Sequence, residues 1–160
     1  MLFRSPAGRD AGACRAPVTL LVAIGNTLRR DDGAAVRVLE LLGAAEGVST
    51  VVCQQLAPEL AEDVGRAGAV IFVDADVEPG PARIERLESA PGGALPATHH
   101  LSPGQLVALA SLLYSFRGEA WLCRVPGENF TGGIGLSDCA EANAGAAARL
   151  VRERLRALAP

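Results

Sequence analysis

One stretch of the sequence indicates the fold class: Val18-Thr-Leu-Leu-Val-Ala-Ile24, followed directly by Gly25-Asn26. The run is almost continuously apolar and rich in β-branched side chains. Runs of this kind are typical of strands buried on both faces, as in parallel sheets that helices cover. The Gly-Asn pair predicts a turn at its end. We therefore expect 18–24 to form an interior strand of an α/β sheet.

Downstream of this run, the apolar residues switch repeatedly between a helical period and a strand-like pattern. The predicted helices cover 32–42, stopped by Gly43, then 58–66, the segment opened by Ser102-Pro103, and the segment opened by Leu136-Ser137. The predicted strands cover 48–53, 69–74 and 120–125, with a weaker edge-strand candidate at 82–87. This β-α-β-α-β-(β)-α-β-α order predicts an α/β three-layer sandwich: a mostly parallel, twisted sheet of about five strands with helices on both faces.

Length and composition favour one globular domain. The chain has 160 residues, of which 49% are hydrophobic and 21% charged, values that argue against disorder. We assign 17–160 to a single α/β domain. Residues 1–16 mix arginines with Gly, Pro and Ala and lack the apolar core of a signal peptide. We expect a flexible leader there, or a start assigned too far upstream, and a cytoplasmic protein whose cysteines are reduced.

Composition and missing motifs exclude several classes of function. The net charge of −3 and the lack of a basic stripe argue against nucleic-acid binding. No apolar run approaches the roughly 20 residues of a membrane span, so no membrane association is expected. The chain has no Lys and therefore no P-loop lysine, and it has no G-x-G-x-x-G, G-x-S-x-G or H-E-x-x-H motif. Cys53 and Cys123 lie in strand-like runs and are expected to be buried, small hydrophobes.

Three polar clusters lie where the C-terminal ends of strands would place a site. They are the turn 25–33, which contains Asp31 and Asp32, the segment Asp74-Ala75-Asp76, and Thr98-His99-His100. Two carboxylates and an imidazole together suit a divalent transition metal such as nickel or zinc. With no fourth protein ligand evident, coordination positions would stay open for a substrate. One aspartate could instead act as a general base.

Each cluster also has a purely structural interpretation. Asp31 could be a helix N-cap, with Asp32 favoured in the first turn by the helix dipole. Asp74 could cap a neighbouring loop, and His99 and His100 could be surface groups. Sequence alone leaves these alternatives open.

The string Gly25-Asn-Thr-Leu-Arg-Arg-Asp-Asp-Gly33 resembles the signature of the nickel–iron hydrogenase maturation endopeptidases. In that family, a G-N-x-L-x-x-D-[DE]-G turn opens the first helix. The resemblance covers about 18–158 and continues through three further strings: Ile71-Phe-Val-Asp-Ala75, Thr98-His99 and Gly133-Ile-Gly-Leu-Ser137.

The resemblance implies a site. The family contacts its metal through an acidic residue of the first motif, an aspartate after the third strand and a histidine before the third helix. These positions fall on Asp32, Asp74 and His99, with His100 as the competing histidine. In some members the histidine lies in an S-P-H-Q segment, where this chain has Ser102-Pro103-Gly104-Gln105.

The resemblance also implies an activity and a partner. These endopeptidases remove the C-terminal extension of the nickel-loaded large subunit of a nickel–iron hydrogenase. Nickel would come with this precursor and be contacted by Asp32, Asp74 and His99, which would also form the catalytic site. The isolated protein could bind another divalent metal. A non-catalytic, nickel-sensing chaperone and a small-ligand or nucleotide enzyme are the alternatives.

Two arginines of the first motif have two interpretations. Arg29 and Arg30 could contact acidic groups on the partner, or they could be solvated charges of the turn. The sequence does not indicate the oligomeric state.

Overall fold

The fold is known from a computed structural model that describes residues 3–4, 18–88 and 101–159. At its centre is a six-stranded sheet of order β1-β3-β2-β4-β6-β5. The strands are β1 (Phe3–Arg4), β2 (Thr19–Ile24), β3 (Val48–Cys53), β4 (Ala69–Asp76), β5 (Arg83–Arg86) and β6 (Glu119–Pro126). The four inner strands pair in parallel, and the edge strands β1 and β5 are antiparallel. The predicted mostly parallel α/β sheet is confirmed.

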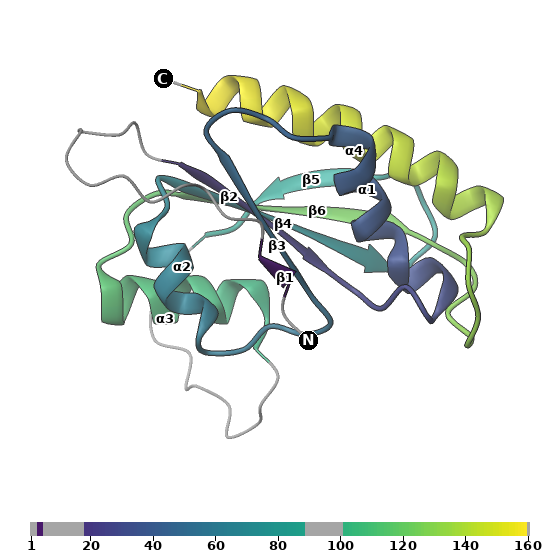
Figure 1. The fold of residues 1–160 in the computed structure, drawn as a ribbon, viewed down its shortest axis with the longest axis horizontal. Helices are drawn as coiled ribbons and strands as arrows, with labels where there is room; N and C mark the ends of the chain where they lie inside the picture. The colour runs from purple at the N-terminus through teal and green to yellow at the C-terminus, as the bar shows by residue number, and fades with distance from the viewer. Residues whose placement is uncertain (1–2, 5–17, 89–100, 160) are drawn as a thin grey trace.

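Helices cover both faces of this sheet (Figure 1). On one face lie α2 (Leu60–Arg66) and α3 (Pro103–Tyr114). On the other lie α1 (Ala34–Leu42), which follows the short 3-10 helix η1 (Arg30–Gly33), and α4 (Asp138–Leu158). Two buried clusters result, one between the sheet and α2/α3 and one between the sheet and α1/α4. These are the three layers that the sequence predicted.

Strand β2 lies between β3 and β4 inside the sheet, and each of its residues is buried. Leu20, Val22 and Ile24 pack in the α2/α3 cluster, whereas Leu21 and Ala23 pack in the α1/α4 cluster. Successive side chains of a strand point to opposite faces, so a strand between two helical layers must be apolar at every position. This explains the continuous run from which the fold was inferred.

Local signals define the helix ends. Gly43 ends α1 with φ +68°, and its N–H donates to Leu39 O. Ser102 caps α3 through a capping box with Gln105, and Pro103 occupies the first turn. Ser137 caps α4, its side chain accepting from the N–H of Ala140. These caps agree with the predicted starts and stops.

The sheet has six strands where about five were predicted. The additional strand is β1, in the segment predicted as a flexible leader, where Phe3 pairs with Val52 and Arg4 with Val51. A strand of two residues is too short to carry an alternating pattern, so the sequence gives no signal for it. The rest of the leader lies outside the described residues.

The predicted edge strand and the predicted burial of Cys53 and Cys123 are confirmed. The candidate edge strand forms as β5 and pairs antiparallel with β6. Cys53 and Cys123 are buried free thiols, and burial raises the pKa of Cys123 to about 12. No helix in the described part of the chain is long and apolar enough to cross a membrane.

Candidate active site at the carboxyl ends of the strands

Asp74 lies near the carboxyl end of β4, opposite Ile24 of β2 and Arg124 of β6. Its side chain follows Val70 and Phe72 in the alternation of the strand, and these pack in the α2/α3 cluster. Asp74 is partly buried on that face of the sheet. Parallel strands end at the same edge, so the turn after β2 begins beside it.

The turn after β2 positions Asp32. Gly25 has φ +152°, and a Cβ there would lie 1.9 Å from the backbone O of Asp32. Only glycine allows this close approach. The N–H of Asn26 donates to Asp32 Oδ2 at 2.9 Å, and the N–H of Leu28 donates to Asn26 Oδ1 at 2.9 Å. The Gly-Asn pair therefore holds the Asp32 carboxylate in a fixed position.

Charge couples the two carboxylates. Burial and then the negative charge of Asp32 raise the pKa of Asp74 to about 6, although Arg124 lowers it. Burial, and then Asp74, also raises the pKa of Cys53 to about 11. A carboxylate pair of this kind can take up a proton near neutral pH or bind a cation, which relieves the repulsion.

Asp76, the other acidic residue of the segment, is already engaged. It is 8% exposed, forms an ion pair with Arg83, and accepts from the N–H of Glu78 at 3.0 Å. Although burial would raise the pKa of Asp76, the Glu78 hydrogen bond and Arg83 lower it. Asp76 thus stabilises the β4–β5 connection, and Asp74 is the carboxylate left for chemistry.

The predicted histidines, His99 and His100, lie outside the described residues. Within 3–4, 18–88 and 101–159, no three His, Cys, Asp or Glu side chains form a group that could hold a metal. Leu101, which follows His100, packs against the same α2/α3 cluster as Ile24 and Cys53. The described chain therefore enters α3 on the face of the sheet that carries Asp74.

Asp31 has a role that the sequence did not indicate. Its carboxylate is fully buried and accepts from the N–H groups of Glu128 (2.8 Å), Asn129 (2.9 Å) and Ser137 (2.6 Å) and from Ser137 Oγ (2.7 Å). Burial alone would raise the pKa of Asp31, but these hydrogen bonds outweigh it and lower the pKa. The N-cap interpretation of Asp31 is wrong, because α1 begins after Gly33 and Asp31 binds the β6–α4 loop instead.

Backbone hydrogen bonds join the same two loops. Arg30 N–H donates to Gly133 O at 3.0 Å, and Gly133 N–H donates to Leu28 O at 2.9 Å. Asp31 N–H donates to Asn129 O at 3.0 Å. The first and last sequence motifs therefore contact each other at the carboxyl ends of the strands, and the buried carboxylate of Asp31 adds hydrogen bonds between them.

Solved structures share this fold. The hydrogenase maturating endopeptidase HybD from E. coli has a TM-score of 0.64 and 28% identity, covering 87% of this chain and 92% of its own. An endopeptidase from Escherichia coli, solved in solution, has a TM-score of 0.68 and 27% identity, with coverages of 87% and 92%. The chain resembles the hydrogenase maturation endopeptidases.

Other comparisons agree with the fold or find nothing. The [NiFe] hydrogenase maturation protease HycI from Thermococcus kodakarensis has a TM-score of 0.64 over 88% of this chain and 93% of its own. At 19% identity it supports the fold alone. No protein-family model matches the sequence, and no curated protein matches it. The predicted resemblance is confirmed by structure, over most of the chain.

In this fold, Asp32 and Asp74 interact through their charges, because the negative charge of Asp32 raises the pKa of Asp74. Their assignment as site residues, and that of His99, stays a prediction. Sequence reasoning missed the Asp31–Ser137 connection. The only available signal was the Gly-Leu-Ser string before α4, whose serine was recognised as part of a helix start and not as a partner of Asp31.

Proposed function

We propose that this protein is an endopeptidase that removes the C-terminal extension from the nickel-loaded large-subunit precursor of a nickel–iron hydrogenase. The observation that carries the proposal is the coupled pair Asp32 and Asp74 at the carboxyl edge of a fold shared with hydrogenase maturation endopeptidases. The cytoplasm is the proposed compartment, and Cys53, Cys123 and Cys139 are free thiols, as a reducing compartment requires.

Nickel is part of the substrate in this proposal. Asp32, Asp74 and His99 would contact it, with His100 as the alternative histidine. The donor set fits a divalent cation, because repulsion from Asp32 contributes to the pKa of about 6 at Asp74, and a cation between the carboxylates would reverse that effect. Contact through the metal would make cleavage depend on whether the precursor is loaded.

The carboxylates also suit proton transfer. A pKa of about 6 at Asp74 lies close to the range in which a general base works best near neutral pH. Asp32 is held by the N–H of Asn26, so its contribution is positional and electrostatic. As the alternative to metal contact at Asp74, we propose that this carboxylate accepts a proton from the water that attacks the peptide carbonyl. The proton then passes to the amine released when the C–N bond breaks, and Asp32 keeps the neighbouring charge fixed.

The deciding experiment is intact-mass spectrometry of the cognate precursor, co-expressed with this protein with and without nickel. We expect loss of a short C-terminal peptide only with nickel, and at least a roughly 100-fold slower loss with Asp32→Asn. Asp138→Asn is the matched control, because Asp138 is exposed in the first turn of α4. A precursor that stays bound but uncut by wild type would replace the endopeptidase with a binding module.

A further inference from the structure

Arg30 has an unusual backbone. Its φ is +47°, a conformation that costs a non-glycine residue about 1 kcal/mol or more. Among the described residues, only Ser115 is another non-glycine residue with positive φ, and Ser115 has a structural reason, since it is the left-handed C-cap of α3. Arg30 begins η1 and ends no helix, and its N–H donates to Gly133 O at 3.0 Å, which holds this conformation. Glycine would adopt the same backbone without strain, so the arginine side chain is the feature to account for.

The Arg30 side chain packs against a glycine beside a small cavity. A Cβ at Gly133 would lie 2.9 Å from Arg30 Nε and 3.1 Å from Arg30 Cζ, so the guanidinium rests on the bare backbone there. The cavity has a volume of about 150 Å³ and is also lined by Thr27, Ile134 and Leu136. This volume accommodates a carboxylate with its methylene groups.

The charge of Arg30 is not balanced within the described part of the chain. Its Nε is buried and has no hydrogen-bond partner. Arg37, the other cation of the cavity, pairs with Glu40 at 3.1 Å and with Glu141 at 2.8 Å. Glu40 is therefore occupied, and the cavity keeps one free positive charge. An arginine that is partly desolvated and unpaired is suited to a carboxylate from another molecule.

Exposed apolar side chains lie on the two loops that meet at this cavity. Leu28 is 64% exposed and Ile134 is 83% exposed. The backbone hydrogen bonds through Gly133 hold their two loops together, and Asp31 fixes both from below. Arginine is enriched at protein–protein interfaces, and exposed apolar side chains near it add surface that a partner can bury. A rigid surface loses little entropy when it binds.

We propose that the cavity at Arg30 is a docking site for an acidic side chain on the surface of the precursor protein, with Leu28 and Ile134 contacting apolar groups around it. This inference rests on the proposed function, because it takes its partner from it. It adds a recognition contact separate from the contact of Asp32 and Asp74 with nickel. Docking at Arg30 requires no metal.

The test measures the affinity of the purified precursor, without nickel, for wild type, Arg30→Glu and Arg30→Gly. Glycine accepts the positive φ, so Arg30→Gly removes the side chain without added strain. We expect Arg30→Glu to weaken binding at least roughly tenfold at low salt, and Arg30→Gly somewhat less. Arg117→Glu is the matched control, because Arg117 is exposed before β6, at the opposite edge of the sheet, and it should bind within about twofold of wild type.

A charge swap identifies the precursor residue. Each acidic surface residue of the precursor is replaced by arginine in turn, and one such replacement should restore binding to Arg30→Glu. Unchanged binding of Arg30→Glu overturns the inference. The inference is also overturned if no arginine replacement restores binding and binding returns only when residues added to the precursor move its terminal carboxylate, because Arg30 then contacts that carboxylate and not a side chain. If the wild type cleaves the precursor and Arg30→Glu binds it as well as the wild type does, only the docking site is refuted. If the wild type binds the precursor without cleaving it and Arg30→Glu weakens that binding, only the peptidase is refuted.

Discussion

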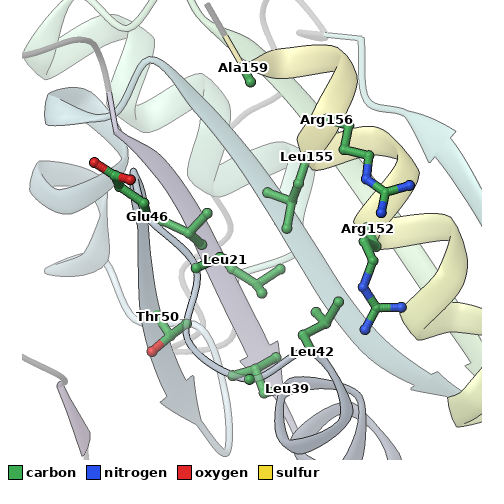
Figure 2. A pocket seen from close by; sticks show the side chains of 12 residues that line it. Leu21, Leu39, Leu42, Glu46, Thr50, Arg152, Leu155, Arg156 and Ala159 are labelled. Carbon is green, nitrogen blue, oxygen red and sulfur yellow. The ribbon is translucent and has the colours of Figure 1, made fainter.

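The two ends of the parallel strands offer different surfaces. At the carboxyl ends, Asp32 and Asp74 lie close enough to repel each other. Toward the amino ends, a groove of about 360 Å³ opens between α1 and α4, with Leu21, Leu39, Leu42 and Leu155 along it. Figure 2 shows these leucines, with Arg152 and Arg156 on the α4 side and Glu46 across from them. The groove has more volume than the cavity at Arg30, and most of the residues that line it are apolar.

The two ends also differ in how well their charges and backbone conformations are satisfied. In the groove, partly buried leucines extend the α1/α4 cluster, and Arg152 is satisfied by donating to Leu41 O at 3.1 Å. At the end of the sheet with Asp32 and Asp74, here called the acidic edge, a half-buried carboxylate faces a like charge, and Arg30 adopts a strained backbone. Strain and unbalanced charge concentrate at functional sites. The comparison favours the acidic edge as the place of the proposed chemistry, and the following predictions test it.

The largest effect on stability is expected at Asp31. Asp31→Asn replaces a carboxylate oxygen with an N–H group that faces donors from Glu128, Asn129 and Ser137. We expect the free energy of unfolding to fall by about 3 kcal/mol. Denaturant unfolding followed by fluorescence of Trp121, the only tryptophan, measures it. Asp138→Asn is again the control, and a loss below about 1 kcal/mol would mean that the two loops hold together without Asp31.

A smaller effect, of opposite sign, is expected at Asp74. Its folded pKa of about 6 exceeds the unfolded value of about 3.9. Between these values the folded state binds more protons, so stability should decrease as pH rises from about 4 to about 6. Two pKa units correspond to roughly 3 kcal/mol, and the partial exposure of Asp74 reduces this value. Asp74→Asn should therefore lose this part of the pH dependence and be roughly 2 kcal/mol more stable at pH 7, while cleavage is lost. Unfolding at several pH values checks it, and an unchanged profile would contradict the raised pKa of Asp74, which burial and then Asp32 produce.

The elements that carry these residues were predictable, because their signals are local. The apolar run of β2, Gly43 and the Ser102 capping box each specify an element through residues a few positions apart. Asp74 could be placed for the same reason, since it follows a buried strand. The fold class followed from the order of such elements.

The connections within the acidic edge were not predictable, because they are non-local. The partners of Asp31 lie 97 to 106 residues further along the chain, and the local pattern favoured an N-cap instead. The left-handed conformation of Arg30 depends on its hydrogen bond to Gly133, which no pattern around Arg30 reveals. The sequence therefore indicated which residues are candidates for catalysis or metal contact, whereas the structure shows which hydrogen bonds join the first and last motifs.

The smallest effect is expected in the groove, and it separates the two ends most directly. Leu155 is partly buried against the α1/α4 cluster, so Leu155→Ala should lower the free energy of unfolding by about 1 kcal/mol. Precursor cleavage, compared at equal concentrations of folded protein, should stay within about twofold of wild type. Leu113→Ala is the matched control, because Leu113 is 60% exposed on α3. If Leu155→Ala instead slowed cleavage as much as Asp32→Asn, with Leu113→Ala unaffected, the groove would belong to the substrate site and chemistry could not be assigned to the acidic edge alone.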